Sequence, residues 1–505
     1  MGARALPGLL AALLLAACGT TVPLADRQKV DGTGLSGPLG QVTTGTPDQG
    51  TATGTGALGG AASGSAAGST GAQAPEPGGD LSQEAAGPIA NGAAALGPGI
   101  DAHNVYIGVP TNQDFDTAVQ ALGVNGLNTG DQQGDVKAVV AYINKHGGVL
   151  GRKLVPVFHD NNSLESSSDP AKTAQVNCTA FTQDHAVAAV WNLAFQDDQN
   201  FMGCLTQQRV PFFSYYSYPV DDQVTRSFPY LFAYAGYRVK SYVPALVERQ
   251  EALGYFKPWD TTNGKPGIAP VRIGIEYDTG HPSHERFAKA LAARLKARGF
   301  DVAPLFAWDG NPSGASAVVL RFAADHVTHV YVDNTAGNLL IMQAAEQQHY
   351  RPRYAADAYG SGTALLEQLA PAAQLHGMLG IGSFPSSDVT PEQSPGDVSP
   401  AGPLCRQMLH DQGLSYPRYS YAEGLAFLTC DGVRQIAAAL DKAGTSVLIP
   451  FVQVARELGP RIQSSAMFAN GFSPTSPVQV SMSRDLGYVD SCSCFRFLSR
   501  INRPS

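Results

Sequence analysis

The sequence is poor in charged residues and contains no basic run. Charged residues make up 15% of the 505 residues, and the formal net charge is −8. A nucleic-acid-binding surface needs clustered Lys and Arg to neutralise phosphates, so this composition excludes nucleic acid as a partner. No apolar stretch inside the chain reaches the roughly 20 residues needed to cross a bilayer, which also excludes an internal transmembrane helix.

Signatures of catalysis are weak as well. The Asp-Thr-Gly triplet at 278–280 matches that of aspartic proteases, but the sequence holds no second copy to share a proton with it. Gly-Ser-Gly at 360–362 is too short for a nucleophile elbow. His281 and His284, beside Glu285, are more typical of a solvated helix start than of a metal site. The sequence therefore predicts a protein that is not an enzyme and has no cofactor or metal.

The chain has seven cysteines, of which Cys18 stands apart near the start. The other six form an even set, typical of a protein exported to an oxidising compartment. Their spacing matches no zinc-ligand pattern, so we expect structural thiols or disulfides, with fifteen pairings open. They are Cys178, Cys204, Cys405, Cys430, Cys492 and Cys494.

The N-terminus is typical of a secretory signal. Arg4 precedes the apolar run Leu9–Ala17, which is too short to span a bilayer, and Cys18 follows it. Leu15–Cys18 resembles the lipobox of bacterial lipoproteins, in which the cysteine receives a diacylglycerol thioether. The alternative is an ordinary signal peptide with a chance cysteine. The resemblance implies export and lipid anchoring through Cys18 to the outer face of a bacterial cell membrane.

Residues 19–100 are mostly Gly, Ala, Thr and Ser. Such a segment buries too little apolar surface to offset its ordering entropy, so we expect a flexible coil. Its root-mean-square reach is roughly 45–50 Å, enough for a spacer above a membrane. A tail without a task is the alternative interpretation.

The rest of the chain alternates strand and helix patterns twice, which predicts parallel sheets covered on both faces. Its roughly 400 residues suit two lobes better than one core. The expected strands are 105–109, 154–158, 187–191, 210–214, 271–277, 302–306, 327–332, 354–356, 478–482 and 495–498. The expected helices are 136–143, 168–184, 197–207, 283–298, 313–325, 335–348, 402–412 and 420–443.

The segment Asn144–Asp160 is similar to one in the branched-chain amino-acid-binding (Leu/Ile/Val-binding-like) family of ABC-transporter substrate-binding proteins. There the pattern is N-x-x-Gly-Gly-(Ile/Val)-x-Gly-(Arg/Lys)-…-Asp, and Gly147 and Gly148 can take the left-handed conformations needed at a helix end. Tyr277-Asp278-x-Gly280, opening the second lobe, strengthens the resemblance. It implies the type I periplasmic binding protein (Venus-flytrap) fold: α/β, with two doubly wound parallel-sheet lobes. Three crossovers would join them, near 228–237, 377–385 and 445–475.

On this resemblance the chain divides into a signal peptide, a linker, two lobes and a C-terminal part. The two helices that hold Cys178 and Cys204 are often joined by a disulfide in the family, and Cys405–Cys430 is a plausible second pair. The pairing of Cys492 and Cys494 stays open. The predicted ranges are 1–18 for the signal peptide, 19–100 for the linker, 101–232 and 386–447 for lobe one, 237–380 for lobe two, and 448–505 for the hinge and closing strands.

The ligand is expected between the lobes, at the carboxyl ends of the strands. Any one of these side chains could instead be core, as we expect for Trp191, and Asp197 and Asp198 are better explained as helix caps. The predicted ligand-binding residues are Asn192, Ala194, Phe195, Gln196, Ser214, Tyr215, Tyr216, Tyr277, Asp278, Asn334, Asp357 and Tyr359.

The ligand's identity stays open. Relatives that bind amino acids hold the ammonium with a lobe-two carboxylate, near the position that is Ala358 here, with Asp357 one residue away. Aromatic, amide and hydroxyl side chains instead suit a ring-shaped or polyhydroxylated ligand. An amino-acid-like ligand is not excluded.

Together these features predict a lipid-anchored extracellular solute-binding protein. It would be a monomer that captures a small polar ligand between its lobes and delivers it to an ABC permease. The alternative is a ligand-sensing or wall-associated interaction lipoprotein without a permease.

Overall fold

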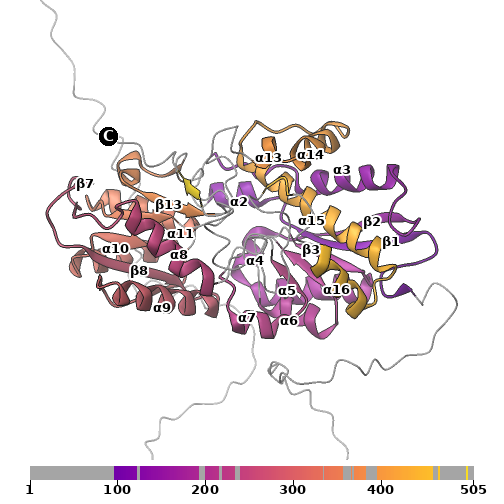
Figure 1. Cartoon of the computed structure of the whole chain (residues 1–505), viewed down its shortest axis with the longest axis horizontal. Coiled ribbons are helices and arrows are strands. Elements are labelled where there is room, and N and C mark those ends of the chain that lie inside the picture. Colours follow the sequence, from indigo (N-terminus) through magenta and orange to yellow (C-terminus); the bar gives the residue numbers. More distant parts are fainter. Residues whose placement is uncertain are drawn as a thin grey trace, which may run out of the picture. The chain divides into compact units, whose positions relative to one another are not determined.

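The computed structural model describes residues 96–121, 126–192, 199–214, 219–233, 239–333, 335–356, 366, 369–382, 395–458, 464–466 and 496–498 (Figure 1). The predicted signal peptide with Cys18, nearly all of the predicted linker, Cys492, Cys494 and the expected strand 478–482 lie outside these residues. No helix in the described ranges is both long and apolar enough to span a bilayer.

The first sheet is parallel, with the strand order β2-β1-β3-β4-β5. Its central strands are apolar on both faces: Ile107, Val190 and Phe213 are all fully buried. Because β2 lies on one side of β1 and the later strands on the other, the sheet is doubly wound. Its strands are β1 (Asn104–Thr111), β2 (Lys153–Asp160), β3 (Ala189–Asn192), β4 (Phe212–Ser214) and β5 (Leu231–Ala233).

Helices from two distant parts of the chain cover this sheet. The C-terminal helices α14 and α15 both pack on α3, and α15 also contacts β3 and β4 (Figure 1). Trp191 is fully buried, which confirms its expected place in the core. The helices are α2 (Phe115–Ala121), α3 (Gln132–Lys145), α4 (Ser163–Ser168), α5 (Pro170–Thr179), the π-helical turn η2 (Ala180–Asp184), α6 (Gln199–Gln207), α7 (Asp222–Ser227), α13 (Pro395–Val398), α14 (Ala401–His410), α15 (Tyr421–Ala443) and α16 (Leu448–Leu458).

The second sheet repeats the topology of the first. Its order is β10-β8-β11-β12-β13-β14, β9 also pairs with β8, and only β14 is antiparallel. The strands are β8 (Arg272–Asp278), β9 (Asp301–Val302), β10 (Phe306–Trp308), β11 (His329–Tyr331), β12 (Arg353–Ala356), β13 (Leu379–Gly382) and β14 (Arg496–Leu498); β6 (Trp259–Asp260) and β7 (Lys265–Pro266) form a separate hairpin. The helical elements are α8 (Val239–Ala252), α9 (Pro282–Ala297), η3 (Pro312–Gly314), α10 (Ala315–Ala324), α11 (Thr335–Gln347) and η4 (Ala372–Leu375). The predicted α/β class with two doubly wound sheets is confirmed.

The family-like segment folds as a helix stop and a tight turn. Gly147 and Gly148 have φ angles of +108° and +73°, which confirms the role expected of them. Asn144 fixes the turn from the helix side, because its amide accepts from Leu154 N (2.7 Å) and donates to Leu154 O (2.9 Å). A Cβ at Gly148 would overlap Arg152 O, so a side chain is excluded there.

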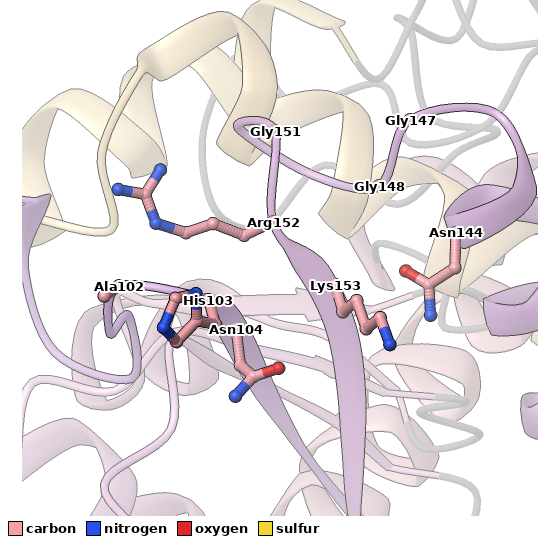
Figure 2. A pocket seen from close by; sticks show the side chains of 9 residues that line it. All are labelled: Ala102, His103, Asn104, Asn144, Gly147, Gly148, Gly151, Arg152 and Lys153. Atoms are coloured by element: carbon pink, nitrogen blue, oxygen red, sulfur yellow. The ribbon is translucent and has the colours of Figure 1, made fainter.

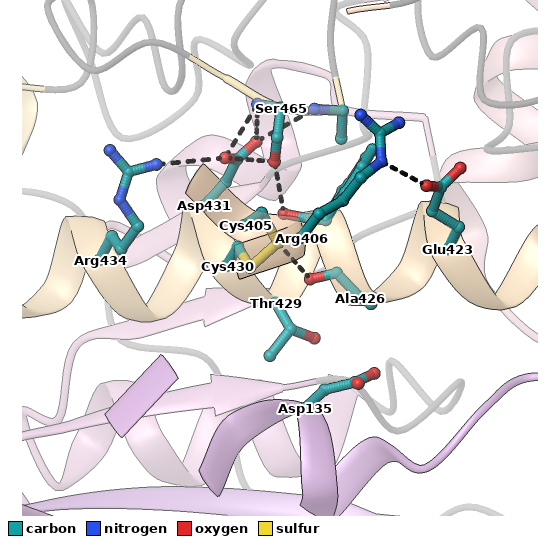
Figure 3. Close-up of a disulfide and its surroundings, with 12 residues drawn as sticks. Asp135, Cys405, Arg406, Glu423, Ala426, Thr429, Cys430, Asp431, Arg434 and Ser465 are labelled. Atoms are coloured by element: carbon teal, nitrogen blue, oxygen red, sulfur yellow. Dashed lines mark hydrogen bonds and ion pairs between the residues drawn. A yellow bond between two sulfur atoms is a disulfide. The ribbon is translucent and has the colours of Figure 1, made fainter. Parts of the chain in front are cut away.

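The disulfide that the resemblance implied and the second pair expected beside it are both present. Cys178 of α5 is bonded to Cys204 of α6, with a Cα–Cα distance of 6.2 Å. Cys405 of α14 is bonded to Cys430 of α15, with a Cα–Cα distance of 5.9 Å, between an Arg406–Glu423 ion pair and the bonds that Ser465 makes to Asp431 (Figure 3). Each bridge ties together two helices of the first lobe.

The local expectations had mixed outcomes. The helix start expected at Ser168-Asp169-Pro170 is confirmed, because Asp169 caps α5 with its side chain, Pro170 starts that helix, and η2 continues it to Asp184. The strand expected over 302–306 is interrupted, because Pro304 has no N–H to pair. The crossovers expected near 228–237, 377–385 and 445–475 stay predictions; β5, β13 and α16 lie within these ranges.

Candidate ligand-binding site

Each of the two sheets has a topological switch point, which is the place where the strand order reverses. In the first sheet, β1 lies between β2 and β3, and in the second, β8 lies between β10 and β11. Open α/β sheets bind ligands outside the carboxyl ends of their strands at this place. The candidate site is therefore built from the residues that end β1, β3, β8 and β11.

In lobe one, a chain of hydrogen bonds follows the end of β1. The Thr111 hydroxyl donates to Asp160 Oδ1 at the end of β2 (2.8 Å). The Asn112 amide donates to Ser163 Oγ (3.2 Å), and that hydroxyl donates to Asp114 Oδ1 (2.6 Å). Asn112 is 2% exposed, and its Oδ1 has no hydrogen-bond partner among the described residues. These bonds fix amide and hydroxyl groups in place, as recognition of a polar ligand requires.

The ends of β3 and β4 are joined by a direct contact. Asn192 and Ser214 lie opposite each other in the register, and the Asn192 amide donates to Ser214 Oγ (3.2 Å). Both are buried. The structure thus brings these two predicted residues together, while their contact with a ligand stays a prediction.

In lobe two, β8 ends in Tyr277 and Asp278, both partly exposed. Asp278 Oδ1 accepts a hydrogen bond from Gly280 N (2.6 Å), which orients the carboxylate at the strand end. Tyr277 packs against the core that α8 and α9 share with the sheet. Asp278 is therefore the better placed of the two to meet a charged ligand group.

Behind Asp278 lies a buried polar network. Glu276 and His284 are 0% exposed, and Asp333, just after β11, is 3% exposed. His284 Nδ1 contacts Asp333 Oδ2, and Asp333 N donates to Glu276 Oε2 (3.4 Å). Burial lowers the pKa of His284 to about 4 and raises the pKa of Asp333 and of Glu276 well above their ordinary values. Near pH 7 His284 therefore favours its neutral form.

The expectation of a solvated helix start was wrong. His281 is 5% exposed and caps α9, since its Nδ1 accepts from Ser283 N (3.3 Å). Burial lowers the pKa of His281 to about 3. Within the described residues, no group of three or more His, Cys, Asp or Glu side chains is arranged to hold a metal ion.

One ion pair links α7 of the first lobe to α9 of the second. Arg286 Nε pairs with Asp221 Oδ2, and its Nη2 donates to Asp221 Oδ1 (3.3 Å). Asp221 also caps α7 through Gln223 N and Val224 N. The ion pair therefore connects the start of α7 in the first lobe to the first turns of α9 in the second.

A surface pocket of about 490 Å³ lies at the other end of lobe one, by the amino ends of β1 and β2 (Figure 2). Arg152 and Lys153 point in different directions there, and Arg152 already donates to Asp101 O (2.7 Å) and Leu150 O (2.8 Å). Because its polar groups do not converge, this pocket is not the candidate site. It is lined by Ala102, His103, Asn104, Asn144, Gly147, Gly148, Gly151, Arg152 and Lys153.

Of the predicted ligand-binding residues, Asn192, Ser214, Tyr277 and Asp278 are described. Sequence reasoning missed Thr111, Asn112 and Glu276, although each lies at or near the carboxyl end of a strand. Their position at a strand end was the sequence signal that could have identified them. The other predicted residues lie outside the described part: Ala194, Phe195, Gln196, Tyr215, Tyr216, Asn334, Asp357 and Tyr359.

Comparison with known proteins places this architecture. A family model described as periplasmic binding protein matches residues 123–448, more than half of the chain. No curated protein matches the chain.

Solved structures match both lobes at low identity, which shows the fold. A possible leucine/isoleucine/valine-binding protein from Rhodopirellula baltica is 16% identical with a TM-score of 0.52, covering 76% of this chain and 93% of that one. A branched-chain amino acid ABC transporter protein from Thermus thermophilus with bound valine is 14% identical with a TM-score of 0.51 (76% and 87%). A fatty acid ABC transporter substrate-binding protein from Thermomonospora curvata is 12% identical with a TM-score of 0.52 (76% and 88%).

Proposed function

Because the chain belongs to the periplasmic binding protein family, we propose that it is an extracellular solute-binding protein that delivers a small polar ligand to an ABC importer. The observation that carries this proposal is the pair of equivalent switch points, each ending in fixed polar side chains. Ligand would contact Asn112 and Asn192 in lobe one and Asp278 in lobe two.

The mechanism is capture by lobe closure. A ligand that touches both lobes binds the closed state more tightly than the open one, and so shifts the population toward it. The Asp221–Arg286 ion pair would contribute to the stability of the closed state. The protein would act without changing the ligand covalently, and the permease would read the closed form.

The solved relatives do not fix the ligand. The Thermus thermophilus protein holds valine, while the Thermomonospora curvata protein is described for fatty acids. Since one fold serves such different ligands, the class must come from the side chains of this site. The described strand ends of lobe one offer amides, hydroxyls and carboxylates rather than an apolar pocket, which favours a polar ligand.

The proposed location is the outer face of the cell membrane, with Cys18 lipidated and the linker as a spacer. The described chain starts at Leu96, whose carbonyl accepts from Ser446 N (2.7 Å) and Thr445 Oγ1 (2.7 Å). Leu96, near the end of the predicted linker, is therefore hydrogen-bonded to the loop between α15 and α16. A pull on the linker would act on lobe one at this loop.

The test is to find the ligand. Protein purified without denaturation should release a small molecule that mass spectrometry identifies, and the compound should rebind after removal. A membrane preparation with the cognate permease should take that compound up only when the protein is present. Rebinding without uptake would favour the sensing lipoprotein, and no bound molecule would contradict both functions.

A further inference from the structure

Three carboxyl groups lie together at the switch point of the second sheet. Glu276 and Asp278 stand two residues apart on β8, and Asp333 follows the neighbouring strand β11. Asp333 N donates to Glu276 Oε2 (3.4 Å), so the two buried carboxyl groups are neighbours. Asp278 is close enough to act on the charge of both. Within the cluster, Asp278 is partly exposed, whereas Glu276 and Asp333 are buried.

Within the described ranges, no fixed positive charge pairs with this cluster. Arg286 pairs with Asp221, and burial keeps His281 and His284 neutral near pH 7. Among the described residues at this edge of the two sheets, the basic one is Arg496, which stands opposite Gly382 in the β13–β14 register, with β11, β12 and β13 between it and β8. At the equivalent edge of lobe one the acidic residues Asp114 and Asp160 accept hydrogen bonds from Ser163 and Thr111.

A second observation points to a missing partner. Glu276 Oε1 and Asp333 Oδ1 are buried, and neither has a hydrogen-bond partner in the described part of the chain. An oxygen buried without a partner lowers stability, and native proteins rarely keep two side by side without a reason. A donor that arrives with the ligand would remove this deficit.

We propose that the ligand is an organic cation, whose ammonium or guanidinium group is received at the Asp278 end of lobe two with Glu276 and Asp333 behind it. This inference rests on the proposed function and narrows its ligand class. A carboxylate on the ligand would meet no Lys or Arg in the described site, so a net positive charge fits better than a zwitterion.

Proton release follows from the same geometry. Burial and the neighbouring carboxylates raise the pKa of Glu276 and of Asp333 well above their ordinary values. A bound cation favours their ionised forms and expels protons. The titratable groups that face Glu276 and Asp333 are Asp278, His281 and His284. The neighbouring strand β10 has no titratable residue. In the helices, the charged residue of α11 is Glu346 near its far end, and Arg321 of α10 pairs with Asp325.

The test uses the full-length protein and yeast extract as the probe. Protein stripped of ligand by partial unfolding and refolding is incubated with the extract, and captured molecules are identified by mass spectrometry. Capture of a compound with a net positive charge at pH 7 supports the inference. Capture of a neutral, zwitterionic or anionic compound overturns the inference but leaves the proposed function intact. If nothing is captured, both are contradicted.

Variants then locate the charge contact with the captured compound. Asp278→Asn should weaken its binding about tenfold or more, because a charge-assisted hydrogen bond is lost. Asp309→Asn is the matched control: it removes the same charge from the end of β10, at an exposed position, and should change Kd less than threefold. Equal effects of the two variants would overturn the assignment.

Glu276→Gln tests the role of the two buried carboxyl groups, Glu276 and Asp333. It keeps the side-chain shape, and its fold is checked by circular dichroism. Titration calorimetry of the wild type in phosphate and in Tris, whose ionisation enthalpies differ, should report proton release that falls in Glu276→Gln. Buffer-independent heats in the wild type would overturn the role of the buried carboxyl groups, and a Glu276→Gln chain that does not fold leaves the Asp278 and Asp309 comparison decisive.

Discussion

Trp191 of β3 lies directly against Gly432 of α15, and a Cβ at position 432 would overlap the indole ring. The contact joins the first sheet to a helix from a distant part of the chain, since 432 − 191 = 241 positions separate the two residues, roughly half of the chain. We expect Gly432→Ala to destabilise the protein by about 1–3 kcal/mol, because the rigid ring cannot move out of a packed core. Urea unfolding measures this. Gly444→Ala is no suitable control because its φ is positive, whereas Gly203→Ala of α6, with open space around it, should have a much smaller effect.

The Cys405–Cys430 bridge closes a loop with a sequence separation of 25. In the chain-entropy model, replacing both cysteines with serine should lower the free energy of unfolding by about 3 kcal/mol. The measurement is urea unfolding of the oxidised wild type and of the double variant. A double variant as stable as the oxidised wild type would show that the bridge does not form in the exported protein.

The Asp221–Arg286 pair predicts a salt-sensitive contribution to closure. Arg286→Gln should weaken ligand binding a few-fold at low salt, and by less as ionic strength rises, because partly exposed pairs are screened. Arg294→Gln is the control, since Arg294 lies on the same helix and pairs with Glu248 within lobe two. If the two variants have the same affinity, the pair has no role in closure.

Asp135 predicts a pH dependence of stability. It is 1% exposed, accepts the Tyr416 hydroxyl (2.8 Å), and burial raises its pKa to about 8. Because this folded-state pKa lies above the unfolded value, the folded state binds the proton more tightly. The contribution is therefore fully present below about pH 4 and is lost as pH rises toward 8.

Asp135→Asn keeps an acceptor for Tyr416 and removes the ionisation. Its stability relative to the wild type should rise between pH 5 and pH 8, as measured by urea unfolding at each pH. A constant difference between the two proteins across this range would mean that Asp135 does not titrate there.

The sequence predicted the fold where short-range chemistry decides it. The strand around Val105–Val109 and the turn at Gly147 and Gly148 follow from apolar pattern and φ preference, and both are confirmed. The helix start at Asp169 and Pro170 was predicted from their capping signals and is confirmed, whereas the short helix α4 before it was missed. α16 was missed because its segment was assigned to a crossover.

The site was predicted only as a set of strand ends. Asn192 and Ser214 were found because each closes an apolar strand. The burial of His284 could not be read from the sequence, because its partner Asp333 lies 49 residues away along the chain. The Asn112–Ser163 bond spans 51 residues and has no local signal either.

The central claim is that one ligand bridges both lobes at the strand ends. Hydrogen–deuterium exchange of the full-length protein, with and without the compound it releases, tests this most directly. We predict slower exchange of backbone amides in both 111–114 and 278–281, with little change around 147–152 at the far end of lobe one. Protection confined to one lobe, or protection at 147–152 instead, would contradict the account.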